Sequence, residues 1–159
     1  MISRNYWPLY FLIIIFFLIV GCKTTPYQKE SDLFNNYLLA NFEQRIEKEK
    51  HYYFIANSYV CKGCIKKYLH VLNSFLVDNQ KRTDIYLITT LNYNILNDIE
   101  SKVSLMIDKD KNIDYENLNL HDLNLYITQD NEIKEIYSYS IEQEDSYRKK
   151  LNDIFNKRQ

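Results

Sequence analysis

The chain has 159 residues and carries 20 basic and 21 acidic side chains, a formal net charge of −1. This length suits one domain with a substantial hydrophobic core. The balanced charge argues against a strongly basic surface for nucleic acid, so we expect no nucleic-acid partner.

The N-terminus has the pattern of an export signal. Residues 1–8 carry Arg4 and no acid, and an apolar run follows from Leu9 to Val20 before Gly21 and Cys22. A basic start and a short apolar core are typical of a secretory signal, whereas a membrane span needs about 20 apolar residues. The ending "IVGC" resembles a bacterial lipobox, which implies a signal peptide over 1–21 and a lipid on Cys22. An ordinary secretion signal and an uncleaved anchor are the alternatives, and all three readings export the rest of the chain.

A polar segment and a helix are expected next. Residues 22–32 contain Pro26 and few apolar side chains, which favours a lipidated tether. Residues 33–50 have apolar side chains at helical spacing, which predicts an N-terminal helix. The apolar positions are 33, 34, 37, 38, 42 and 46.

Strands and helices alternate through the remainder of the chain. The hairpin prediction is supported by Asp130-Asn131, a pair suited to a tight turn. The expected elements are a strand at 51–57, helix 61–77, strand 83–90, helix 92–102, a strand-like segment at 103–110, a hairpin at 123–140 and helix 142–158. This order predicts an α/β fold whose mixed central sheet is flanked by helices.

Two of the three cysteines form a C-x-x-C pair where the first strand gives way to a helix. If Cys22 carries lipid, Cys61 and Cys64 are the remaining thiols, and an exported compartment permits them to form a disulfide. Closing a two-residue gap removes little entropy from the unfolded chain, so the pair is a poor structural staple. The pair is therefore expected to serve chemistry.

A zinc site is the other reading of the pair, because C-x-x-C supplies half of the ligands that such a site needs. Three histidines are available as further ligands, and none has the paired spacing of a zinc motif. They are His51, His70 and His121. We therefore expect neither a metal nor another cofactor.

The segment "FIANSYVCKGC", followed by "DIYLITT" and "LNLYITQDNEIKEI", resembles the thioredoxin-like family, in particular its membrane-anchored extracytoplasmic thiol–disulfide oxidoreductases. The resemblance covers roughly residues 50–156. It implies a thioredoxin-like domain over 51–159, with helix 33–50 as an N-terminal addition. Protein thiols or disulfides would be the partners, and the domain would face the periplasm or the cell exterior, held to the membrane by its N-terminal lipid.

The resemblance also implies roles for the residues of the motif. Cys61 would be the attacking thiolate at the helix start and Cys64 the resolving thiol one turn on. Lys62 would favour the thiolate by its charge, and Gly63 would relax the turn.

Three features depart from active members of the family. Val60 replaces the aromatic residue that commonly precedes the first cysteine, and the strand "YYFIA" lacks the family's buried acid. The family's cis-proline position falls near His121 or Asp122, and no proline follows Pro26. A trans peptide is therefore expected there, since a cis bond without proline costs about 3–4 kcal/mol. These departures keep a second reading open, a non-catalytic thioredoxin-fold lipoprotein that binds a protein or peptide.

Overall fold

The computed structural model describes residues 26–56, 62–76, 81–90, 96–114, 118, 120–140 and 142–156. The predicted signal peptide and Cys22 lie outside the described residues. The helices and strands are α2 (Gln28–Phe42), β1 (His51–Ala56), α3 (Lys62–Phe75), β2 (Arg82–Thr89), α4 (Leu96–Glu100), β3 (Val103–Ile107), the 3₁₀ helix η1 (Asn112–Asp114), β4 (Leu123–Gln129), β5 (Glu132–Tyr139) and α5 (Glu144–Phe155).

The five strands form one mixed sheet in the order β3-β2-β1-β4-β5. Strands β1, β2 and β3 are parallel, β4 is antiparallel to β1, and β5 is antiparallel to β4. The expected α/β class with a mixed central sheet flanked by helices is confirmed. Alternating strands and helices build the parallel half, and the hairpin adds the antiparallel half.

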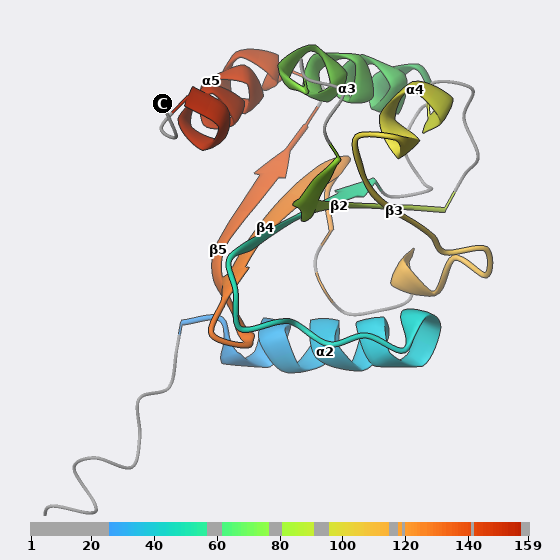
Figure 1. The fold of residues 1–159 in the computed structure, drawn as a ribbon, viewed down its shortest axis with the longest axis vertical. Coiled ribbons are helices and arrows are strands. Elements are labelled where there is room, and N and C mark those ends of the chain that lie inside the picture. Colours follow the sequence, from blue (N-terminus) through green and yellow to red (C-terminus); the bar gives the residue numbers. More distant parts are fainter. Residues whose placement is uncertain are drawn as a thin grey trace, which may run out of the picture.

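Each face of the sheet has its own core, because successive side chains of a strand point to opposite faces. In β1, Tyr52 and Phe54 pack with α3, α4 and α5, whereas Tyr53 and Ile55 pack with α2. Figure 1 shows this arrangement, with α2 and the short η1 on one side of the sheet and α3, α4 and α5 on the opposite face. All six residues of β1 are buried, so this strand is the centre of the molecule.

The hairpin between β4 and β5 agrees with the prediction from its tip. Asp130 and Asn131 have φ angles of 56° and 65°. Both angles lie in the left-handed region, which Asn and Asp tolerate better than most residues. The Asp-Asn tip therefore fixes where β4 ends and β5 begins.

The prediction of a helix over 33–50 is wrong at both ends. Helix α2 begins at Gln28, within the expected tether, and ends at Phe42. Glu43 adopts a left-handed conformation with φ of 55°, and the N–H of Gln44 donates to the Leu38 carbonyl, so the last turn is closed. Beyond it the chain runs to the hairpin tip, where the Lys48 carbonyl accepts a hydrogen bond from the N–H of Asp130.

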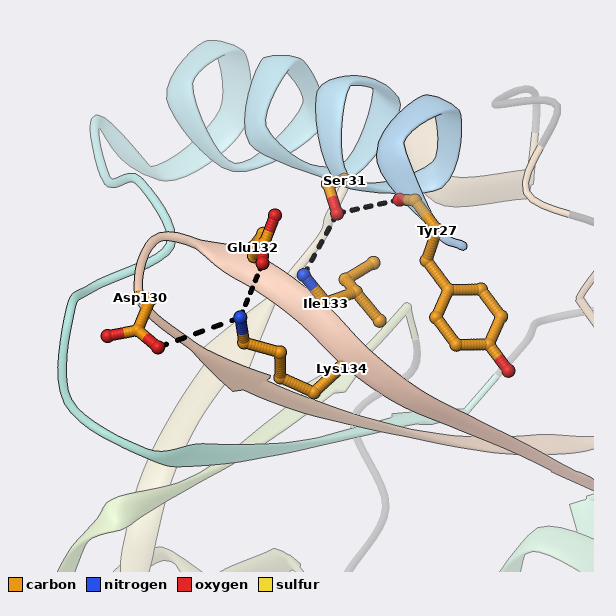
Figure 2. Close-up of polar contacts among 6 residues, drawn as sticks. All are labelled: Tyr27, Ser31, Asp130, Glu132, Ile133 and Lys134. Atoms are coloured by element: carbon orange, nitrogen blue, oxygen red, sulfur yellow. Dashed lines mark hydrogen bonds and ion pairs between the residues drawn. The ribbon is translucent and has the colours of Figure 1, made fainter. Parts of the chain in front are cut away.

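A buried serine attaches α2 to strand β5. The Ser31 hydroxyl donates to the Tyr27 carbonyl at 2.7 Å and accepts from the N–H of Ile133 at 2.9 Å. Figure 2 shows this bridge from the first turn of α2 to the strand. Because Ser31 is 1% exposed, water cannot replace its hydroxyl for the Ile133 N–H.

We predict that Ser31→Ala lowers the free energy of unfolding by about 1–3 kcal/mol, since the buried N–H of Ile133 loses its partner. Urea titration followed by circular dichroism measures the change. Ser74→Ala is the matched control, because the Ser74 hydroxyl donates to the Val71 carbonyl of its own helix and bridges no second element among the described residues. Equal effects of the two substitutions would contradict the bridging role of Ser31.

Candidate thiol site at the end of strand β1

The C-x-x-C pair falls where β1 gives way to α3. Cys64 is in the first turn of α3 and is half-buried, and Gly63 beside it is exposed. Val60 and Cys61 lie outside the described residues, and only the backbone of Lys62 is described. The first turn of a helix carries N–H groups without helical partners, and together with the helix dipole they stabilise a thiolate. Cys64 therefore occupies a place where sulfur chemistry is favoured.

The buried and exposed residues of this helix lie on separate faces. Leu69 and Leu72 are buried, whereas Lys66, Lys67 and His70 are exposed. This division fixes the rotation of α3 about its axis. The rotation directs Cys64 partly toward the sheet.

The two residues expected near the thiols lie at the start of β4. In the β1–β4 register Ala56 is opposite Leu123, so His121 and Asp122 lie beside the end of β1 from which the chain continues to Cys61. His121 is exposed and Asp122 is half-buried. Their peptide bonds are trans, as are all those among the described residues, which confirms the expectation of a trans bond here.

Tyr68 connects α3 to the segment after β5, a role that the sequence did not indicate. It is buried one helical turn beyond Cys64, and its hydroxyl donates to the Ser140 carbonyl. Burial raises the Tyr68 pKa most, and the charges of Asp122, Cys64 and Glu144 raise it further. The hydrogen bond holds the first turns of α3 against the end of β5.

An ion pair holds α3 against α5 at the same end of the sheet. The Lys67 ammonium lies 2.5 Å from the Glu144 carboxylate, which also accepts from the Arg148 guanidinium at 2.7 Å. These two cations lower the pKa of Glu144. Since the pair is solvent-accessible, it orients the helices more than it stabilises them.

Asn124 fixes the backbone just before β4 and was also not anticipated. Its Oδ1 accepts from the N–H of His121 at 3.2 Å, and its Nδ2 donates to the carbonyl of the same residue at 3.0 Å. Oδ1 also accepts from the Ser138 hydroxyl at 2.9 Å. The hint in the sequence is an asparagine between two leucines of a strand, a position where asparagine is disfavoured.

The three histidines lie in different parts of the fold. His51 is buried at the beginning of β1, the end opposite the thiol site, and His70 is exposed on α3. Among the described residues there is no group of three His, Cys, Asp or Glu side chains placed to bind a metal. Within the same residues, every helix is too short or too polar to cross a membrane.

A polar hollow of about 610 Å³ lies at the far end of the sheet, between α2 and the hairpin tip. Its lining residues are Asp32, Asn35, Asn36, Arg45, Ile46 and Asn131. Strand β4 separates the tip from the turn at His121, a distance of roughly 20 Å for seven extended residues. The hollow is therefore separate from the thiol site.

The comparisons with known proteins give no family assignment. No protein-family model and no curated protein matches the sequence. The site is therefore interpreted from its own residues.

Three buried tyrosines underlie the first turns of α3. The ring of Tyr147 contacts those of Tyr68 and Tyr139, with centroids 5.2 and 5.1 Å away. The hydroxyls of Tyr139 and Tyr147 have no hydrogen-bond partner in the described part of the chain. Burial raises the Tyr147 pKa well above 10, and Tyr139 and Tyr68 add to the rise.

We predict that Tyr147→Phe stabilises the protein by about 1 kcal/mol, because it removes a buried hydroxyl that lacks a partner. It should also reduce alkaline unfolding. A tyrosine whose folded pKa is raised contributes stability that is present below about pH 10 and is lost as the pH rises above that. Urea titrations at neutral and alkaline pH measure both effects.

Tyr68→Phe is the control for this substitution, because it removes a hydroxyl that donates to the Ser140 carbonyl. We expect it to destabilise the protein by about 1 kcal/mol. Destabilisation by Tyr147→Phe would contradict the assignment of an unsatisfied hydroxyl and would indicate an internal water bound to it.

Proposed function

We propose that the chain is a thioredoxin-like protein that exchanges disulfides with protein thiols through Cys61 and Cys64, outside the cytoplasm. The main support is the position of Cys64 in the first turn of α3, directly after the buried strand β1. The strand order and the closing hairpin and helix are compatible with a thioredoxin-like fold. Thiol–disulfide exchange is the chemistry that such a fold would place at this thiol pair.

The exchange would proceed in two balanced steps. The Cys61 thiolate attacks one sulfur of a partner disulfide, forming a mixed disulfide and releasing the other partner sulfur as a thiolate. Cys64, as thiolate, then attacks the Cys61 sulfur, and the second partner thiolate leaves. The partner gains two electrons and the chain becomes the Cys61–Cys64 disulfide. The reverse sequence would oxidise a partner dithiol.

The proposed protein would be attached to the membrane by a lipid. A lipid on Cys22 would hold the domain at the periplasmic or exterior surface. Because α2 begins at Gln28, residues 22–27 would form the whole tether. Six residues span at most about 20 Å. The domain would therefore work close to the membrane surface.

A non-catalytic protein-binding or peptide-binding lipoprotein is the second candidate. The sequence feature that favours it is the absence of proline after Pro26, together with Val60 before the first cysteine. In this case the thiol pair would be incidental to binding. The two candidates differ in whether partners become covalently attached.

We predict a reversible two-electron transition of the Cys61–Cys64 pair between about −120 and −270 mV, the range of known thiol–disulfide exchangers. Redox titration of the full chain in detergent against glutathione and dithiothreitol, read by thiol alkylation and mass, measures it. A pair that never forms a disulfide, or one that stays oxidised well below about −300 mV, would contradict the enzyme and leave the binding protein.

A trapping experiment distinguishes the candidates directly. In Cys64→Ser the second step is blocked, so Cys61 should remain joined to partners as mixed disulfides that dithiothreitol releases. Cys61→Ser is the control and should trap none. Partners that bind equally to both variants without a covalent bond would support the second candidate.

A further inference from the structure

We propose that Asn124 is a positioning residue for the thiol site, because its amide clamps the turn at His121 and Asp122 beside the end of β1 that leads into the C-x-x-C motif. This inference rests on the proposed function. It names a residue outside the C-x-x-C motif on which the rate of exchange depends.

The side-chain amide of Asn124 makes three hydrogen bonds. Oδ1 accepts from the N–H of His121 and from the hydroxyl of Ser138, while Nδ2 donates to the His121 carbonyl. The residue is 1% exposed. Burial without these bonds would cost free energy, so the three bonds account for a polar residue at this position.

An amide side chain suits this contact pattern. A single planar group must accept from an N–H and donate to the C=O of the same residue, and asparagine carries both functions on adjacent atoms. Aspartate would oppose its carboxylate to the His121 carbonyl, and an aliphatic residue of the same size would leave both backbone groups unpaired. Asn124 thereby occupies the two backbone groups of His121 that a pairing strand would use.

The strand register places this clamp beside the end of β1 from which the chain continues to α3. Asn124 lies opposite Ile55 in β1 and opposite Ser138 in β5. It is therefore anchored between two neighbours one residue from the point where β1 ends. Tyr68, one helical turn after Cys64, donates to the carbonyl of Ser140, which follows the β5 residue paired with Leu123, so α3 is tied to the same end of the β4–β5 hairpin. A shift of the clamped turn changes the surroundings of the sulfur.

The decisive variant is Asn124→Leu, which keeps the approximate volume and removes the amide. Thr128→Val is the matched control, because Thr128 is a buried polar residue of the same strand whose hydroxyl has no partner among the described residues. Three quantities are measured on the full chain in detergent: the free energy of unfolding, the hydrogen-exchange protection of the His121 amide, and the rate at which the reduced protein reduces oxidised glutathione.

We expect Asn124→Leu to lower the protection of the His121 amide about ten-fold or more, because its hydrogen bond is lost. We expect it to slow the reduction of glutathione disulfide about ten-fold or more, because the groups around the reacting sulfur are misplaced. Thr128→Val should leave the protection of the His121 amide and the rate of glutathione disulfide reduction within about two-fold of the wild-type values. Asn124→Asp should resemble Asn124→Leu in rate while keeping an acceptor for the His121 N–H.

The possible results distinguish a failure of the Asn124 clamp from a failure of the proposed function. Unchanged protection of the His121 amide in Asn124→Leu would overturn the clamp itself. Lost protection with an unchanged rate would overturn the positioning role. A wild-type protein that protects this amide but reduces no disulfide would overturn the proposed function, and the positioning role would fall with it. Should Asn124→Leu fail to fold, Ser138→Ala, which removes one of the three bonds, takes its place.

Discussion

The pairing of β1 with β4 is the constraint on which the rest of the structure depends. Strand β1 is buried on both faces and lies between a parallel and an antiparallel neighbour. Its register with β4 sets Ala56 opposite Leu123, and this one pairing brings the start of α3 and the turn before β4 to the same edge of the sheet. A slip of one residue would exchange the inward and outward side chains of the strand, so the two cores on its faces hold the register in place.

Helix α2 is part of this constraint, because it covers one face of the sheet. The side chains of Tyr53, Ile55 and Tyr126 point from the sheet toward this helix and are buried by it. The Phe34 ring contacts the rings of Tyr53 and Tyr126 edge-on. A second polar contact fixes its other half, where the buried Asp108 carboxylate accepts from the Tyr37 hydroxyl at 3.1 Å. Removing α2 would leave one face of the sheet in water. An anchor at Cys22 would therefore pull on a helix that is built into the core.

The sequence predicts those features whose cause is local. The rotation of α3 follows from apolar residues at helical spacing, and the hairpin tip follows from Asp130-Asn131. The end of α2 is different, since the charged run "EKEK" suits a longer helix. In the structure the left-handed Glu43 closes the last turn, and Glu47 and Lys48 accept hydrogen bonds from the hairpin tip instead. Tyr68 and Asn124 escape prediction for the same reason, because Ser140 lies 72 residues from Tyr68 and Ser138 lies 14 residues from Asn124. Their roles exist only once the strands are paired.

The turn before β4 illustrates how one restraint can replace another. A proline ring restrains its own backbone covalently, whatever surrounds it. The Asn124 amide restrains His121 only while it is buried and aligned between Ile55 and Ser138, because water would compete for the same groups. The restraint therefore depends on the integrity of the sheet at this edge, and local opening of β5 would release it. The geometry beside the thiols is then coupled to the packing of an edge strand, and α5, which packs against that strand through Tyr139 and Tyr147, belongs to the same cooperative unit.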